Sequence, residues 1–381
     1  MSIRWKARRR KLPGALAVMA GLLVASGAQA ADQSSDKSDP AAPGVSTPDR
    51  PNAPTPLGIY GVNQPKQGVF SLSINPGYFA LSGSLIGTQS MSPVQAVTDP
   101  SVKTTFGPIV GKPVQVRNVP ATVNIGFVGF GLTYGLTKDF AVTVASAYLD
   151  KNQDVNVFKG MSGSTLLGQS DAGTQGISDT ALVGLYRLYH DSMNQINVFF
   201  GFFLPTGSTT ENEGGFNNSG KYGTKRAVYT LQLGTGTVDA LPGITYSGVL
   251  GKWSWGLAFR GRYALDTNAQ GYRWGAYSEF DGWGGYTWLP GLSTTLRVMG
   301  QVIGHIDGYD PQILGYGPCS NPLWFGGDFV DILPGLSISG RYFDMPAATA
   351  SVAFDVPVYQ NLNGLHTARN YGVLTGLKFK F

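Results

Sequence analysis

Residues 253–265 read WSWGLAFRGRYAL, and large apolar side chains alternate along them with small or charged ones. The odd positions hold Trp253, Trp255, Leu257, Phe259, Tyr263 and Leu265, and the even positions hold Ser254, Gly256, Ala258, Arg260 and Arg262. Because successive side chains of a β-strand point to opposite faces, this period of two predicts a strand with one apolar and one polar face. The stretch is also longer than the ~5–6 residues of a typical soluble strand.

The next two stretches, 271–288 and 291–306, repeat the pattern. Their apolar faces hold Tyr272, Trp274, Ala276, Phe280, Tyr286 and Trp288 in the first, and Leu292, Leu296, Val298, Val302 and Ile306 in the second. Long strands with Tyr and Trp near their ends are typical of transmembrane barrels, whose lipid-facing band is bordered by aromatic girdles. A soluble β-sandwich with an aromatic surface is the alternative.

Composition and loop lengths agree with a barrel. Charged residues make up only 13% of the chain and 53 of its 381 residues are Gly, which excludes a coiled coil. Strands are expected at 68–81, 119–136, 139–150, 176–190, 194–204, 230–250, 252–265, 271–288, 291–306, 325–340, 351–360 and 371–381. Long connections alternate with short ones over most of the chain, as external loops and periplasmic turns do in outer-membrane proteins.

The predicted fold is therefore an all-β, antiparallel up-and-down transmembrane β-barrel over residues 67–381. We expect about 12 strands, with 10–14 possible, long external loops and short periplasmic turns. The apolar parity of 119–136 flips near Phe127 and Val128, which predicts a bulge there. The expected location is the outer membrane of a Gram-negative cell, with its lipid as a partner.

The first 66 residues are expected to lie outside the barrel wall. Residues 1–30 combine a basic start, an apolar stretch and Ala28-Gln29-Ala30, the pattern of a cleaved signal peptide. Residues 31–66 are rich in Pro and predict a disordered periplasmic tail, with a plug or a docking segment as alternatives. All the excess positive charge lies in the leader, so we infer no nucleic-acid partner.

The last strand carries the most specific short signal. Tyr371, Phe379 and the terminal Phe381 lie on one face, with Lys378 and Lys380 on the other. This pattern resembles the C-terminal strand by which the outer-membrane assembly machinery recognises its substrates. An amphipathic edge strand is the other interpretation.

Polar side chains opposite the apolar band are the candidate lining of a water-filled lumen and solute path. They are Arg260, Arg262, Asp266, Arg273, Glu279, Asp281, Arg297, His305 and Asp307. Twelve strands fall between small filled barrels and open porins, so a narrow channel is expected. The alternative is an ion-paired network that fills the lumen and only stabilises the wall.

An 11-residue segment occurs twice. VDALPGITYSG at 238–248 recurs as VDILPGLSISG at 330–340, with Asp239 and Asp331 in equivalent places. Because Pro is tolerated in strands mainly at bulges or edges, each copy is expected to bend the wall locally. A Pro-Gly turn between two strands is the competing interpretation.

Several segments together resemble one known family. Gly176–Thr180, Tyr186–Leu188, Leu204–Gly207, Gln232–Gly243, Trp253–Gly256, Ile306–Pro311, Gly326-Gly327 and Pro357–Gln360 with Gly364 are similar, in this order, to the meta-pathway phenol-degradation family of outer-membrane transporters. The resemblance covers roughly residues 176–381. It implies a β-barrel and the uptake of aromatic or hydrophobic compounds, and it brings no catalytic or binding residues.

Catalytic and metal signals are weak. His190, His305 and His366 lack metal-ligand spacing, so neither a metal nor a cofactor is expected. Asp307 and Asp310, with Asp328, form either hydrogen-bonded turns or a Ca²⁺ site. We expect a non-enzymatic channel for small solutes. The alternatives are a structural or adhesive barrel with a closed lumen, and an outer-membrane hydrolase or acyltransferase using His305.

Overall fold

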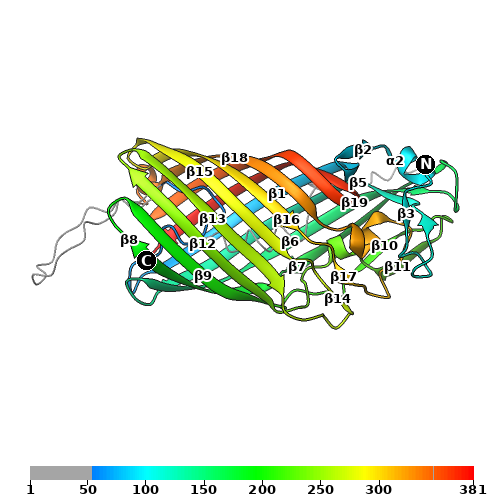
Figure 1. Cartoon of the computed structure of the whole chain (residues 1–381), viewed down its shortest axis with the longest axis horizontal. Coiled ribbons are helices and arrows are strands. Elements are labelled where there is room, and N and C mark those ends of the chain that lie inside the picture. Colours follow the sequence, from blue (N-terminus) through cyan, green and yellow to red (C-terminus); the bar gives the residue numbers. More distant parts are fainter. Residues whose placement is uncertain (1–53, 346) are drawn as a thin grey trace, which may run out of the picture.

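The computed structural model describes residues 54–345 and 347–381, and residues 54–66 precede a closed antiparallel β-barrel (Figure 1). Its wall contains eleven strand elements, each hydrogen-bonded to the next, and the last pairs with the first. They are β1 (Phe70–Gly87), β5 (Asn118–Gly135), β6 (Phe140–Phe158), β8 (Thr180–His190), β9 (Asn194–Leu204), β12 (Asp239–Leu250), β13 (Trp253–Ala264), β15 (Tyr277–Leu289), β16 (Leu292–Ile303), β18 (Gly327–Ser339) and β19 (Ala348–Lys380). The predicted all-β antiparallel barrel is confirmed.

The final element, β19, runs along the wall twice, in opposite directions. Thr349 to Leu362 pair with β18, whereas Leu362 to Lys380 pair with β1, and both pairings are antiparallel. In an alternating wall of eleven single crossings, the first and last strands would be parallel. The antiparallel closure therefore requires a reversal inside β19. The Gln360 side chain, which bonds Arg369 across this reversal, marks the two facing arms. Because β19 supplies two antiparallel arms, the eleven elements pass from one end of the barrel to the other twelve times.

The connections at the two ends of the barrel differ in length. One end, here the turn end, has short turns at 136–139, 191–193, 251–252 and 290–291, and the 3-10 helix η5 (Gly340–Phe343). The other, the loop end, carries the small elements seen at the right of Figure 1. These are β2 (Gln89–Met91), α2 (Pro93–Thr98), β3 (Lys103–Thr104), β4 (Val114–Gln115), β10 (Asn212–Phe216), β11 (Tyr222–Arg226), β14 (Tyr272–Arg273), β17 (Asp307–Gly308), η3 (Pro318–Ser320) and η4 (Pro322–Trp324). No helix among the described residues is long and apolar enough to cross a membrane.

One predicted long loop is a strand hairpin. Residues 151–175 form the upper part of β6 and most of β7 (Leu166–Ile177), which pairs with β6 directly beyond β8. β7 and β8 therefore pair with successive parts of the same strand, β6, and are separated only by Ser178 and Asp179. The long β6–β7 ladder extends the wall toward the loop end.

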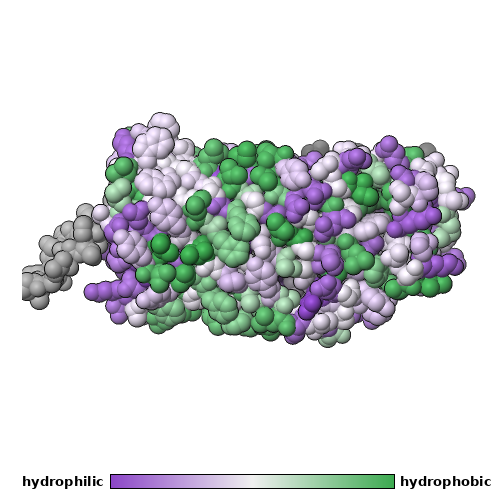
Figure 2. Space-filling model, viewed as in Figure 1, coloured by the Kyte–Doolittle hydropathy of each residue, from purple (hydrophilic) through white to green (hydrophobic). Residues whose placement is uncertain are grey.

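The outer surface of the strands is apolar. Trp253 is 61% exposed and Leu257 63%, while Arg260 on the opposite face is 3% exposed. Figure 2 shows hydrophobic side chains gathered over the strand region, with more hydrophilic side chains toward the loop end. The predicted faces of 253–265 are thus confirmed. Tyr272 and Ile306 are exceptions, because β15 begins only at Tyr277 and β16 ends at Ile303, so both lie buried under the loops.

The predicted bulge near Phe127 is absent. The β1–β5 register runs without a shift from Phe70 to Ser82, and alternate side chains of β5 face inward from Val123 to Gly135. The one register shift of β5 lies earlier, between Pro120 and Thr122 against β6. The apolar pattern changes parity in the sequence because Val123, Ile125 and Phe127 point into the lumen, whereas Val128 and Phe130 are exposed. The sequence pattern therefore records an apolar patch on the inner wall.

Both copies of the repeated segment lie inside strands, so the Pro-Gly turn interpretation is excluded. Pro242 pairs with Phe200 and Pro334 with Leu296, each on the preceding neighbour strand. Toward the following strand the ladder omits each proline, yet the register on its two sides is unshifted, so neither proline itself forms a bulge. The second copy does contain a register shift, between Val330 and Asp331, as expected of a local bend, whereas the first copy shows none. The missing N–H of each proline costs one local contact of the ladder.

Candidate functional site: the lumen

Side chains from β13, β15 and β16 form a buried ion-pair network in the lumen. Arg297 donates from Nε to Asp281 Oδ1 at 2.7 Å and from Nη2 to Glu279 Oε1 at 2.8 Å. Arg260 Nη2 bonds Glu279 Oε2 at 2.8 Å, and Tyr277 also donates to this carboxylate. Arg297 and Glu279 are fully buried. Two guanidinium groups therefore share one carboxylate, an arrangement that offsets the cost of burying charge.

The described part of the Pro-rich segment, residues 54–66, lies against this network. Arg297 Nη1 donates to the Leu57 carbonyl at 2.8 Å, and Ser254 Oγ donates to the Pro54 carbonyl at 2.7 Å. On the opposite wall, Gln195 Nε2 donates to the Val62 carbonyl at 3.1 Å. The segment thus spans the lumen and differs from the expected mobile tail. The segment is held through its backbone carbonyls, which every residue carries. Its amino-acid composition alone could therefore not predict that it lies inside the lumen.

Apolar contacts complete this seat. Leu57 belongs to one cluster with the inward Phe79, Phe127 and Leu374, so the apolar patch of β5 is covered by the segment. Tyr60 stacks on Phe199 at 5.1 Å between ring centroids. The segment therefore lies in an amphipathic slot, with charges on one side and aliphatic and aromatic groups on the other.

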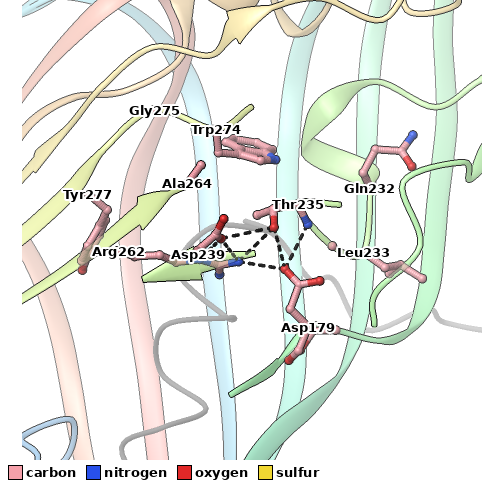
Figure 3. Close-up of a pocket in the computed structure, with 12 residues that line it drawn as sticks. Asp179, Gln232, Leu233, Thr235, Asp239, Arg262, Ala264, Trp274, Gly275 and Tyr277 are labelled. Carbon is pink, nitrogen blue, oxygen red and sulfur yellow. Dashed lines mark hydrogen bonds and ion pairs between the residues drawn. The ribbon is translucent and has the colours of Figure 1, made fainter. Parts of the chain in front are cut away.

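A second charged cluster lies at the break between β7 and β8. Arg262 donates to Asp239 Oδ2 at 2.6 Å and to Asp179 Oδ2 at 2.8 Å, and Thr235 bonds both carboxylates (Figure 3). Trp274 lies above the cluster in Figure 3, and the adjoining cavity is about 30 Å³. All three charged side chains are buried and paired, which indicates a structural cross-link between β8, β12 and β13.

The repeated aspartates have equivalent partners. Asp239 pairs with Arg262, and Asp331 pairs with Arg369 at 3.0 Å between Nη1 and Oδ2. Both are buried on the inner face of the wall. Arg369 was missed as a lumen residue because 361–370 was expected to be a loop. The buried Asp355 lies in the expected strand 351–360 but was not named as a lumen residue. Asp179 was quoted only within a family motif, and it lies in the break between β7 and β8 rather than inside the single strand expected at 176–190.

Four predicted lumen residues lie elsewhere. Arg273 Nε bonds Asp307 Oδ2 at 3.1 Å, and His305 Nε2 lies 3.3 Å from Asp307 Oδ1, all with about half of each side chain exposed. Asp266 is exposed and accepts from the Val238 backbone N–H at 3.2 Å. The strands end before these positions, so their parity does not continue into the loops. Arg260, Arg262, Glu279, Asp281 and Arg297 remain in the lumen.

The enzyme and metal alternatives gain no support at the loop end. Asp307 is paired as above, Asp310 lies 3.6 Å from Arg226, and Asp328 contacts Asn361. Within 54–345 and 347–381, no three His, Cys, Asp or Glu side chains are grouped as metal ligands. In the same ranges, no serine is hydrogen-bonded to His305.

The last strand closes the wall as predicted. Phe70 and Phe381 exchange backbone hydrogen bonds of 2.8 and 3.0 Å, and their rings lie 5.9 Å apart. Tyr371 and Phe381 are exposed, Phe379 is half-buried, and Lys378 is buried inside. Their role in assembly stays a prediction.

A packed layer near the loop end closes the other side of the lumen. Residues 227–237, which include the 3-10 helix η2 (Tyr229–Leu231), turn inward, and Tyr229 packs edge-on against Tyr272 and Phe325. Lys151 donates to the Gln232 carbonyl beneath this layer. Between it and residues 54–66, the cavities found are about 30 and 10 Å³, room for one or two waters. Residues 54–66 and 227–237 therefore fill the lumen at two levels in the described part of the chain.

No protein-family model and no curated protein matches the chain. Solved structures that are similar to this one include an outer membrane channel from Pseudomonas putida F1. The two share 14% sequence identity with a TM-score of 0.49, over 83% of this chain and 97% of that one. The Ralstonia pickettii toluene transporter TbuX has 11% identity and TM-score 0.39 over 84% and 90% of the two chains. The Pseudomonas putida toluene transporter TodX has 8% identity and TM-score 0.37 over 83% and 89%. These values do not assign a function to this chain.

Proposed function

We propose that the protein is an outer-membrane channel for the passive uptake of small aromatic or hydrophobic solutes, with the loop end outside. In this proposal, residues 54–66 plug the lumen and leave it when a solute passes, and the packed layer of residues 227–237 gives way on the loop side. The observation that carries the proposal is the seat of this segment: it fills the lumen, yet hydrogen bonds and apolar contacts alone attach it to the wall.

The chemistry of the vacated slot supports the solute class. Withdrawal of Leu57 uncovers Phe79, Phe127 and Leu374 on one side and leaves Arg297 and Glu279 on the other. An aromatic or short aliphatic solute would replace the apolar contacts that the segment loses, which a sugar or an inorganic ion cannot do. The family resemblance at 176–381 points to the same class.

The experiment is solute entry into liposomes that contain the purified mature protein. A variant lacking residues 54–64 should admit phenol faster than the wild type, and both should admit it faster than a sugar of similar volume. The matched control lacks residues 32–42, which lie outside the described residues. If neither the wild type nor the plug deletion raises phenol entry above that of empty liposomes, the channel proposal fails.

A structural or adhesive barrel is the second candidate, and the fully paired network around Glu279 favours it. Buried, mutually paired charges suit a permanently filled lumen as well as a gated one. This candidate predicts an impermeable barrel even after residues 54–64 are removed.

Three further assignments complete the proposal. Residues 1–30 act as the export signal, Phe381 and its strand direct recognition by the assembly machinery, and the solutes are related to phenol degradation. The first rests on the basic and apolar pattern of the leader, the second on the aromatic end of β19, and the third on the family resemblance alone.

A further inference from the structure

A cavity of about 370 Å³ lies at the loop end. Its walls come from the inner face of β6, from β7, from the β10–β11 hairpin and from residues 314–320. The exposed Lys221 and Tyr222 belong to its lining, so the cavity opens to the medium. Its volume lies within the range of small-molecule sites, and the side chains that remain accessible in it decide what it would bind.

Much of the accessible lining is apolar or aromatic. Tyr222 is 78% exposed. The partly buried members, each of which keeps some surface open to a ligand, include Val155, Phe216, Leu314 and Tyr316. Because removal of such surface from water is favourable, this lining suits a ligand with an aromatic or aliphatic body.

The charged members of the lining leave one cation unpaired. They are Glu213, Lys221 and Lys225, so two lysines stand against one glutamate. Glu213 Oε1 lies 3.0 Å from Lys225 Nζ, and these two charges offset one another. Among the described residues, no ion pair involves Lys221. The cavity therefore presents an ammonium group that a dissolved anion can reach.

A buried guanidinium adds positive charge behind the same wall. Arg117 Nε and Asn218 Nδ2 donate to one carbonyl oxygen, that of Gly160, at 3.0 and 3.1 Å, and Asn218 lines the cavity. The other side-chain hydrogen bonds of Arg117 also go to backbone carbonyls, and no described carboxylate is ion-paired with it. Because a buried charge is screened less by water and salt than an exposed one, Arg117 also favours an anion in the cavity.

We propose that this cavity binds small aromatic or aliphatic monocarboxylates, with the carboxylate at Lys221 and the apolar body against Val155 and Phe216. The site deepens the proposed uptake function and rests on it for its biological role, which is to collect anionic solutes on the outer side of the filled lumen. Lys221 is the residue that distinguishes an anion from a neutral solute of the same shape.

The test is a fluorine NMR titration of the purified mature protein in maltoside micelles. The probes are para-fluorobenzoate and para-fluorobenzamide, a neutral molecule of nearly the same shape, and protein-free micelles give the baseline for partition into detergent. The protein should bind the carboxylate about fivefold more tightly than the amide at low salt. High salt should reduce this difference, because the ammonium group of Lys221 is exposed and screened.

Substitutions of the two charged positions should act in opposite directions. Lys221→Gln should weaken para-fluorobenzoate binding about three- to fivefold and leave para-fluorobenzamide unchanged, whereas Lys221→Arg, which keeps the charge, should retain wild-type affinity. Glu213→Gln frees the Lys225 ammonium for the ligand, so it should strengthen carboxylate binding about threefold. Lys138→Gln, in the exposed turn at the opposite end of the barrel, is the matched control and should change nothing.

Val155→Trp narrows the cavity without changing its charge, so it should weaken the binding of both probes. Equal affinities for the two probes, no binding, the same response in Lys221→Gln and Lys138→Gln, or unchanged binding in Val155→Trp would each overturn the proposal.

The titration needs no transport, so the site and the channel are tested separately. Carboxylate binding without phenol entry into liposomes would leave the site standing while the channel proposal fails. Phenol entry without carboxylate binding would have the opposite meaning.

Discussion

Arg297→Leu is expected to destabilise the barrel more than a typical substitution. The guanidinium is fully buried and bonds Asp281, Glu279 and the Leu57 carbonyl at 2.7–2.8 Å. Glu279 keeps Arg260, but Asp281 loses its only ion-pair partner among the described residues. Removing one partner of a buried pair costs about 3–5 kcal/mol, chiefly because the remaining charge is left without compensation. Urea unfolding in lipid bilayers, followed by tryptophan fluorescence, measures this change in the free energy of unfolding.

The double variant Arg297→Leu with Asp281→Leu tests whether the loss of stability comes from the unpaired Asp281 carboxylate rather than from the loss of the Arg297 side chain itself. Because apolar replacement of both partners of a buried pair is often neutral, the second change should restore most of the lost stability. Both variants also remove the donor to the Leu57 carbonyl, so both should increase phenol entry whatever their stability. A loss below about 1 kcal/mol in the single variant, or a double variant as unstable as the single one, would refute the reasoning.

Four further outcomes are expected. Leu257→Arg, on the lipid-facing surface, should cost about 2–4 kcal/mol in a bilayer folding titration, because it places a charge in hydrocarbon. Arg117→Lys should leave the barrel folded but make residues 159–163 sensitive to trypsin, because the buried guanidinium donates to the carbonyls of Lys159, Gly160, Ser162 and Gly163. Burial raises the pKa of the Cys319 thiol to about 12, so the thiol should resist an aromatic disulfide reagent at pH 8 until the protein unfolds. The buried neutral thiol stabilises the fold fully below pH 9, and this contribution to the free energy of unfolding declines as pH rises toward 12. Deletion of Phe381, which removes two closing hydrogen bonds, should abolish heat-modifiable gel mobility far more than deletion of residues 32–60.

Period-two patterning predicted the wall because lipid and lumen impose opposite requirements on alternate residues. It placed Leu257 outside and Arg260 inside correctly. It failed beyond the ends of the wall strands: Arg273 lies in the short β14–β17 ladder and His305 in a loop, so the barrel wall fixes the direction of neither side chain. The apparent fault at Phe127 shows a third case, in which an apolar inner face contradicts the simple rule that lumen residues are polar.

The site itself needed the three-dimensional structure. Parity left open a water-filled lumen or an ion-paired network around Arg260 and Arg262. Their pairing with Glu279, Asp179 and Asp239 depends on strand register and on the break between β7 and β8 at residues 178–179. The seat of residues 54–66 depends on backbone carbonyls that meet Arg297 and Ser254 from distant strands. Such contacts leave no periodic signal in the segment.

The central claim, a channel closed by residues 54–66, can be tested by a reversible lock. A Cβ built on Gly61 would lie 3.2 Å from Cβ of Asn197 on β9, a little below the ~3.5–4.5 Å of a disulfide, and the φ of +79° at Gly61 makes some local backbone adjustment necessary. Gly61→Cys with Asn197→Cys, in a Cys319→Ser background, should bind the segment to the wall when oxidised.

The measurement is phenol entry into liposomes before and after reduction of this lock. The account predicts no entry above that of empty liposomes in the oxidised protein, and wild-type entry once the disulfide is reduced. Equal entry in both states, or none in either, would contradict it.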